Sequence, residues 1–241
     1  MANIFVRHEK KFLINNEIMK LILDKFGDLL EVDPYTKKDG YSHINNIYFD
    51  TVNNDVIRES VSRPIYKEKL RLRSYHVLED ENEKVYLEIK KKFDGTGNKR
   101  RIPLTYKEAM DFVLKRKFPE SITNDYVTNQ IGLEIEQFLR RNKVIPAIYI
   151  SSKRKAFYGK NDPEFRLTFD FDVKYRRDNV NLLSDVGKNF LKDDEIIMEV
   201  KFGNAIPYEF IEFLSSLGVY KTRFSKYGKI YEYELRNSKL N

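Results

Sequence analysis

Cysteine is absent from the 241 residues of this chain, which excludes a disulfide framework, a thiolate nucleophile and a cysteine-based zinc site. The chain also lacks any apolar run of about 18 residues, the length that a membrane-spanning helix requires. Its first residues, M-A-N-I-F-V-R-H-E-K-K, carry charges where a signal peptide needs an apolar stretch. From these absences we expect a soluble cytoplasmic protein.

Several motifs of common enzyme classes are absent as well. Neither G-x-x-x-x-G-K-[ST] nor G-x-G-x-x-G occurs, so any phosphate must be bound by side chains and not by a glycine-rich loop. Ser151 and Ser152 lack the sequence context of a catalytic triad, which argues against a nucleophilic hydrolase. The three histidines, His8, His43 and His76, have no partner at metal-ligand spacing, and we interpret them as surface or packing residues.

The composition indicates a folded protein with an anionic partner. Hydrophobic residues make up 41% of the chain and aromatic residues 14%, enough for a sizeable core. The net charge is +7, which points to nucleic acid, an anionic membrane or phosphate compounds. The length fits one large β-rich domain or two small ones, and the absence of a clear linker favours a single domain over residues 1–241.

Hydrophobic periodicity predicts many strands with helices between them, which is typical of an α+β protein or a closed barrel. The predicted strands are residues 3–13, 43–50, 65–77, 84–92, 98–104, 147–157, 165–175 and 195–202. The predicted helices are 17–26 with Asn16 as the cap, 105–117 with Thr105 as the cap, 124–142 and 207–217 beginning at Pro207. Residues 224–236 fit either a helix or a strand.

Charged residues occupy every second position in several of these strands. The segments are Arg7-x-Glu9-x-Lys11, Lys69-x-Arg71-x-Arg73, Glu88-x-Lys90, Arg166-x-Thr168-x-Asp170 and Glu199-x-Lys201. Because successive side chains of a strand point to opposite faces, each segment places its charges on one face and its apolar residues on the other. If the strands belong to one curled sheet, these charges line its concave side and form a site for a polyanion.

A solvated surface is the ordinary explanation for any one such segment. Like charges on neighbouring strands repel, however, so recurrence over five segments indicates compensation by a ligand. The tyrosines and phenylalanines are more typical of a core than of a base-stacking surface. Basic and aromatic residues do alternate, a pattern that permits binding of single-stranded nucleic acid.

The charged segments and their neighbours resemble the VTC-domain polyphosphate polymerases of the triphosphate tunnel metalloenzyme (CYTH-like) superfamily. The resemblance runs nearly end to end. It is carried, in order, by R-H-E-K-K-F-L-I, I-Y-F-D-T, K-E-K-L-R-L-R-S-Y, L-E-I-K-K-K, K-R-R-I-P-L, S-S-K-R-K-A-F-Y, F-R-L-T-F-D-F-D, I-M-E-V-K-F and R-F-S-K-Y-G-K.

The resemblance implies a fold and a reaction. The fold is a closed antiparallel eight-stranded β-barrel that forms a tunnel, with helices packed outside. The reaction is transfer of the γ-phosphate of ATP to a growing polyphosphate chain, with Mn²⁺ or Mg²⁺ as the cofactor. ATP and polyphosphate are then the partners, and nucleic acid is not expected.

The resemblance also assigns site residues. The family's phosphate-binding positions fall on Lys11, Arg71, Arg73, Lys90, Lys99, Arg154, Arg166, Lys201 and Lys226, and its metal-binding position falls on Glu199. Arg223 stands where the family often has lysine. We add Arg7, Lys69 and Arg101 as substrate-binding candidates and Glu9 and Glu88 as further metal ligands; Arg101 is preferred to Arg100 because it shares a strand face with Lys99.

Physical chemistry is consistent with this assignment, because phosphoryl transfer is catalysed mainly by positioning and charge neutralisation. Two alternatives stay open. The sister branch of metal-dependent tripolyphosphatases and nucleoside triphosphatases opens with E-x-E-x-K, whereas here Arg7 replaces the first carboxylate, which favours the polymerase branch. The other alternative is a non-catalytic polyanion-binding module. Glu88 and Glu199 argue against it, because carboxylates repel a polyanion unless a metal bridges them.

Overall fold

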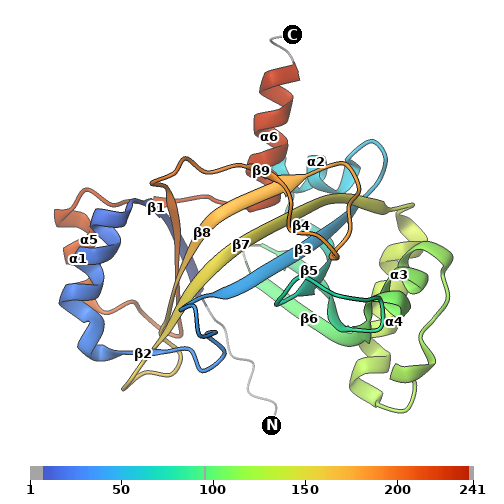
Figure 1. Ribbon diagram of the computed structural model, residues 1–241, viewed down its shortest axis with the longest axis horizontal. Helices are drawn as coiled ribbons and strands as arrows, with labels where there is room; N and C mark the ends of the chain where they lie inside the picture. The colour runs from blue at the N-terminus through green and yellow to red at the C-terminus, as the bar shows by residue number, and fades with distance from the viewer. Residues whose placement is uncertain (1–7, 95, 239–241) are drawn as a thin grey trace. The chain divides into compact units, whose positions relative to one another are not determined.

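The computed structural model describes residues 8–94 and 96–238 (Figure 1). Arg7 therefore lies outside the described residues. The chain folds into two compact units, and each unit is built from segments that are distant in sequence. Of the described residues, unit 1 comprises 8–43, 152–173 and 189–225, and unit 2 comprises 44–94, 96–151, 174–188 and 226–238. The single domain expected from the sequence stays a prediction.

Unit 1 combines short strands with two helices. Its own elements are β1 (His8–Ile14), α1 (Asn16–Phe26), a 3₁₀ turn (Gly27–Leu29), β2 (Leu30–Val32), β10 (Ile196–Phe202), α5 (Tyr208–Ser216) and β11 (Lys221–Thr222). Helix α1 is capped by Asn15, whose side chain accepts a hydrogen bond from the backbone of Ile18, and not by Asn16 as predicted. Figure 1 shows α1 and α5 side by side, and Phe26 packs against Phe210 with ring centroids 5.1 Å apart.

Unit 2 contains the long hairpin strands and most of the helices. Its own elements are α2 (Asp55–Val61), β4 (Tyr66–Ser74), β5 (Lys84–Phe93), β6 (Thr96–Thr105), α3 (Tyr106–Lys115), a 3₁₀ turn (Glu120–Ile122), α4 (Tyr126–Arg141) and α6 (Lys226–Ser238). Thr105 caps α3 as predicted, in a capping box with Glu108. The C-terminal segment, which the sequence left between helix and strand, is the helix α6.

Four strands have parts in both units: β3 (Ser42–Asp50), β7 (Ile145–Gly159), β8 (Arg166–Arg176) and β9 (Lys188–Asn189). The hydrogen-bonded strand order is β11-β1-β10-β8-β7-β3-β4-β5-β6, with β2 on β7 and β9 on β8. Strands β11 and β6 stand at the two ends of this path and do not pair with each other in the described part of the chain. The sheet thus has eleven antiparallel strands with open ends, and the predicted closed eight-stranded barrel is wrong, although the α+β class is confirmed.

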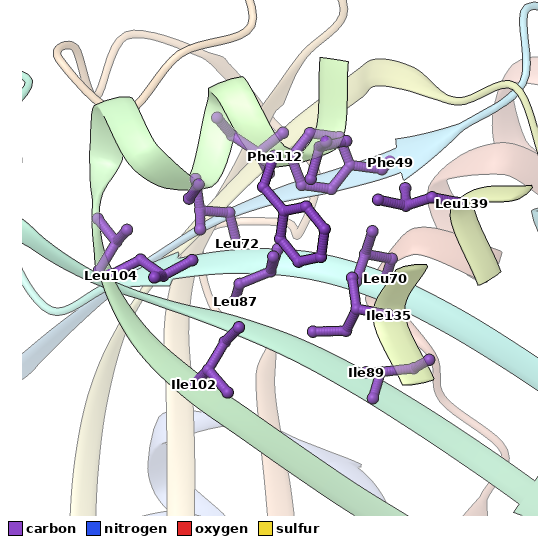
Figure 2. Close-up of a cluster of buried hydrophobic side chains, with 14 of the residues drawn as sticks. Phe49, Leu70, Leu72, Leu87, Ile89, Ile102, Leu104, Phe112, Ile135 and Leu139 are labelled. Carbon is purple, nitrogen blue, oxygen red and sulfur yellow. The ribbon is translucent and has the colours of Figure 1, made fainter. Parts of the chain in front are cut away.

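Each unit buries the apolar face of its strands beneath its own helices. In unit 2, leucines and isoleucines of β4, β5 and β6 pack against Phe112 of α3 and Ile135 and Leu139 of α4 (Figure 2). In unit 1, apolar residues of β1, β8 and β10 pack against Phe26 of α1 and Leu214 of α5. Because strand side chains alternate, the charged residues of the same strands lie on the opposite face of each sheet segment.

Candidate functional site

The first cluster of predicted site residues lies on strands β3 to β6 of unit 2. We call it the unit 2 basic face: Lys69, Arg71, Arg73, Lys90, Lys99 and Arg101, with Tyr48, Tyr86 and Glu88 among them. Strand register sets its rows. Arg71 pairs across the strands with Tyr48 on one side and Glu88 on the other, and Glu88 pairs in turn with Arg101. The next row contains Lys69, Lys90 and Lys99.

A buried ion pair fixes the centre of the unit 2 basic face. The Nε of Arg71 donates to Oε2 of Glu88 at 2.5 Å, and Lys99 Nζ lies 3.6 Å from Oε1 of the same carboxylate. Glu88 is fully buried. Burial alone would raise its pKa, but the positive charges of Arg71, Arg73 and Lys99 outweigh burial and lower the pKa of Glu88 to about 2. Glu88 is therefore ionised near neutral pH and holds Arg71 in one orientation.

Two further residues, which the sequence did not single out, complete this face. The side chain of Asn46 accepts a hydrogen bond from Nε of Arg73 at 3.0 Å and donates one to the carbonyl of Ile150 at 3.1 Å. Asn46 thereby positions Arg73. The hydroxyl of Tyr48 accepts a hydrogen bond from Nη1 of Arg71 at 3.4 Å. Both residues alternate within strand β3, which is the one signal in the sequence that could have identified them.

Tyr48 is an unusual phenol. Burial would raise its pKa, yet the nearby cations Arg71, Arg73 and Lys69 lower the pKa of Tyr48 to about 8. Its ring packs against Tyr227 of α6, with centroids 5.2 Å apart. The hydroxyl of Tyr227 donates to the buried carboxylate of Asp50 at 2.8 Å. Tyr48 is thus supported by the ring of Tyr227, which is itself held in place by its hydrogen bond to Asp50.

Asp50 anchors that support and, with it, the start of α6. Its carboxylate accepts hydrogen bonds from the backbone of Val56 and Ile57, both at 2.9 Å, and so satisfies two donors in the first turn of α2 that have no acceptor within the helix. Lys226, a predicted catalytic residue, is the first residue of α6, directly before Tyr227. Asp50 in the I-Y-F-D-T segment is therefore structural, and it locates Lys226 through Tyr227.

The second cluster lies in unit 1, on strands β1, β10, β8 and the adjoining part of β7. We call it the unit 1 basic face: Lys11, Arg154, Arg166 and Lys201, with Glu9, Thr168, Asp170 and Glu199 among them. Register pairs Lys11 with Glu199, Glu199 with Thr168, and Lys201 with Arg166. The sequence prediction that these charges share one face is consistent with this pairing.

Glu199 is held between two lysines. Lys11 Nζ lies 3.3 Å from Oε2 of Glu199, and Lys201 Nζ lies 2.7 Å from Oε1. Burial opposes ionisation of Glu199, but Lys11, Lys201 and Arg154 together hold its pKa well below the ordinary value. Burial likewise opposes the charge of Lys11, yet Glu199 and Glu9 raise the pKa of its ammonium group. Glu199 and Lys11 are therefore both ionised at neutral pH.

The two arginines of the unit 1 basic face are bound to carboxylates. Arg154 forms a two-pronged ion pair with the buried Asp170, at 2.6 and 2.8 Å. Arg166 donates from Nη2 to Asp33 at 2.7 Å, and its guanidinium lies 4.8 Å from the ring centroid of Tyr158. The sequence did not predict either partner, because both contacts join residues far apart or on different strands.

Metal binding was tested against the acidic residues. In residues 8–94 and 96–238, no group of three histidine, aspartate or glutamate side chains could hold a metal ion. Two carboxylates do converge, because Glu9 and Glu199 lie 3.2 and 3.3 Å from Lys11 Nζ. Mg²⁺ and similar ions use one or two carboxylates together with substrate phosphates and water. Glu9 and Glu199 are therefore the residues that would hold a divalent cation here, together with phosphate oxygens and water.

The remaining predicted residues differ in how firmly they are held. Glu88, proposed as a metal ligand, is committed to Arg71 and Lys99 in unit 2. Arg101 is exposed, with its guanidinium 4.5 Å from the ring centroid of Tyr86. Arg223 is exposed in the segment between β11 and α6. His43 and His76 pair with Asp39 and Glu83, and His8 stacks on Phe202, as expected for surface and packing residues.

Among residues 8–94 and 96–238, every helix is too short or too polar to span a bilayer.

Comparison with known proteins identifies the family. The model of the VTC domain matches residues 6–234. No curated protein gives a significant sequence match. Among solved structures, a candidate adenylate cyclase from Bacillus halodurans is similar in fold, with a TM-score of 0.52 and 13% identity over 92% of this chain and 94% of that chain. Another, from Vibrio parahaemolyticus, has a TM-score of 0.47 and 11% identity over 94% of this chain and 98% of that chain.

At such identities the likeness to solved structures concerns the fold alone. The family model, in contrast, spans nearly the whole chain and includes both basic faces. The ordered motifs of the sequence and the match over residues 6–234 agree, and the chain belongs to the VTC domain family.

Proposed function

We propose that the protein is a polyphosphate polymerase that transfers the γ-phosphate of ATP to the end of a polyphosphate chain. A terminal phosphate oxygen of the acceptor attacks the γ-phosphorus, and the bond between that phosphorus and the β,γ-bridging oxygen breaks. ADP leaves with the electron pair, and the polymer becomes longer by one phosphate. The acceptor oxygen is already ionised, so the reaction needs no general base.

The side chains of this protein bind and orient the reactants. On the unit 2 basic face, Glu88 and Asn46 fix Arg71 and Arg73, so their guanidinium groups are held in defined orientations for contact with phosphate oxygens. On the unit 1 basic face, Lys11 and Lys201 supply mobile positive charge. Cations of either kind can neutralise the charge of a transferring phosphate, which is the main protein contribution to phosphoryl transfer.

A divalent cation is part of the proposal. Glu199 and Glu9 would hold it, with phosphate oxygens completing its coordination. When bound, it would withdraw negative charge from the phosphates and align them. With both carboxylates engaged in this way, the Lys11 ammonium group would contact a phosphate instead of Glu199 and Glu9.

One observation carries the proposal: on each basic face the cations surround a buried, ionised carboxylate in a member of the VTC domain family. A surface that attracts polyanions by net charge alone would be weakened by Glu88 and Glu199, since burying a carboxylate costs free energy and its charge repels phosphate. Carboxylates that orient an arginine or hold a metal explain this cost.

The test is synthesis of polymer. Purified protein is incubated with ATP, Mn²⁺ and a short polyphosphate primer, and the products are separated on a gel. We expect one phosphate to be added to polyphosphate for each ADP that is released. Arg100→Ala is the matched control. Arg100 pairs with Glu134 away from the basic face, so this substitution should leave polymer synthesis unchanged. Release of ADP and orthophosphate without polymer would contradict the proposal and support the hydrolase alternative.

A further inference from the structure

Two tyrosines lie at one end of the unit 2 basic face. Tyr86 shares a row with Arg73 on the neighbouring strand, and Tyr75 directly follows β4. Their rings are in edge-to-face contact, with centroids 5.9 Å apart at an interplanar angle of 73°. Tyr75 is exposed and Tyr86 half-buried, so neither ring belongs to the hydrophobic core of unit 2.

Cations surround this tyrosine pair. The guanidinium of Arg101 lies 4.5 Å from the ring centroid of Tyr86, and its Nη1 donates to the hydroxyl of Tyr75 at 3.4 Å. Lys84 Nζ lies 5.7 Å from the Tyr86 centroid, and Arg73 lies 6.0 Å from that of Tyr75. The pair is therefore continuous with the cations that we assign to phosphate binding.

An inorganic triphosphate gives aromatic rings nothing to contact, because every group that it presents is a charged oxygen. A nucleotide presents a flat base beside its phosphates, and bases stack on aromatic side chains and guanidinium groups. Residues two apart on a strand face are separated by about 7 Å. A base at Tyr86 would therefore place the phosphates of the same molecule along the rows of Arg71 and of Lys69, Lys90 and Lys99.

We propose that Tyr75, Tyr86 and Arg101 form a nucleobase subsite that selects nucleoside triphosphates over inorganic polyphosphate as the phosphate donor. This inference rests on the proposed function and specifies its donor. The base stacks against the tyrosines and Arg101, and Arg73 contacts the phosphate nearest the ribose. The β- and γ-phosphates extend toward Arg71 and Lys99.

Calorimetry with two ligands tests this subsite in the complete chain. The ligands are the non-hydrolysable β,γ-imido analogue of ATP and inorganic tripolyphosphate, both with Mg²⁺. Tyr86→Leu should weaken binding of the analogue about tenfold, within the range for loss of one base–aromatic stack. Its affinity for tripolyphosphate should stay within about twofold of wild type, because the phosphate-binding cations remain.

Three variants make the comparison specific. Tyr86→Phe keeps the ring and should bind the analogue nearly as wild type does. Tyr75→Leu changes an exposed side chain, so it tests the subsite with little risk to folding. Tyr66→Leu is the control, because Tyr66 lies on the same strand as Arg71 but, by alternation, on its opposite face, and it should bind both ligands normally.

The outcomes separate this inference from the proposed function. If wild type binds both ligands but Tyr86→Leu and Tyr75→Leu bind the analogue normally, the nucleobase subsite is wrong and the phosphate site stands. Equal weakening of both ligands would also overturn the subsite, since it would indicate a disturbed basic face. If wild type binds neither ligand, the proposed function is overturned together with this inference.

Discussion

Glu88 in unit 2 and Glu199 in unit 1 are both buried carboxylates on a basic strand face, yet their partners differ. Glu88 accepts from the Nε of Arg71 at 2.5 Å, with Lys99 farther away at 3.6 Å. Glu199 has an ammonium group on each oxygen, from Lys11 at 3.3 Å and Lys201 at 2.7 Å. One carboxylate is thus paired with a guanidinium and the other with two lysines.

The difference separates two roles for the same side chain. Guanidinium is a planar group with donors in a fixed arrangement, whereas lysine is a point charge on a flexible stem. We propose that Glu88 orients Arg71 and keeps that partner throughout the reaction. Glu199 would instead exchange a lysine for a divalent cation, and the displaced ammonium group would turn to a phosphate. Four predictions test this distinction, in order of decreasing effect.

The largest effect is expected for Glu199→Gln. Removing this charge should reduce polymer synthesis by at least about a hundredfold, because a bound metal supplies several kcal/mol of transition-state stabilisation. The variant should still fold, with a lower melting temperature, since Lys11 and Lys201 lose their buried partner but reach solvent in part. Activity is measured with ATP and Mn²⁺, and folding by circular dichroism. Full activity in a folded Glu199→Gln would refute the assignment.

Arg71→Ala should impair both binding and stability. Loss of a charge-assisted contact of about 1.5–3 kcal/mol lowers tripolyphosphate affinity roughly ten- to a hundredfold. The variant also leaves Glu88 buried without its main partner, at a cost of about 3–5 kcal/mol in the free energy of unfolding. Removing one cation also relieves repulsion among the like charges of the face, which by itself would raise stability. The cost of leaving Glu88 without its main partner is larger, so the net effect is a loss of stability.

The double variant Arg71→Ala/Glu88→Gln separates the two effects of Arg71. It should recover much of the stability, since no unpaired charge stays buried, but none of the lost tripolyphosphate affinity. Urea unfolding and calorimetry measure the two quantities. A single variant as stable as wild type would show that Arg71 is an ordinary solvated residue.

Glu88→Gln should alter the pH dependence of stability. The pKa of Glu88 is about 2 in the folded protein and 4.5 without its environment, so its ionised form favours folding. That contribution is complete above pH 4.5 and disappears as the pH falls toward 2. Wild type should therefore exceed Glu88→Gln in stability near neutral pH, by a margin that shrinks in acid. A margin independent of pH would contradict the ion pair.

The smallest effect concerns Tyr48, whose titration reports the cations around it. Its pKa of about 8 predicts one phenol that ionises well before the ordinary tyrosines. Ultraviolet absorbance should show this step in wild type and lose it in Tyr48→Phe. In Arg71→Ala the step should move to higher pH, because the largest favourable charge is gone. If the step is unchanged in Arg71→Ala, the charge of Arg71 does not lower the pKa of Tyr48, and this prediction is wrong.

The alternation of charge in the sequence predicted the strands of both basic faces, because a period of two is a local property of strands. Closure of the sheet was predicted wrongly. Whether edge strands such as β6 and β11 pair depends on distant parts of the chain, and alternation within one strand carries no information on it. The resemblance supplied the barrel, and the strand order corrects it.

Helix α2 shows a second limit of the sequence. Asn54 precedes it with a left-handed backbone at φ 55° and makes no side-chain cap to it. The backbone donors at its start bind Asp50 instead, at the end of the preceding strand. A cap supplied from outside the local motif leaves no signal of the usual kind, so residues 55–61 were not predicted as a helix.

The sequence named the cations of the candidate site but not the residues with which they pair. Arg166 with Asp33, and Arg73 with Asn46, are contacts between residues far apart in sequence. The sequence assigned Glu199 to the family's metal-binding position and added Glu9 and Glu88 as further metal ligands. Only the geometry distinguishes Glu88, fixed to an arginine, from Glu9 and Glu199, which converge on Lys11. The roles of these residues stay predictions.

Mn²⁺ binding in the presence of tripolyphosphate tests the distinction between the two carboxylates most directly. Wild type, Glu199→Gln and Glu88→Gln are titrated with Mn²⁺, and bound metal is measured by electron paramagnetic resonance. We predict that Glu199→Gln loses the bound Mn²⁺ while Glu88→Gln retains it with little change in affinity. Retention of Mn²⁺ by Glu199→Gln, or its loss in Glu88→Gln alone, would contradict the account.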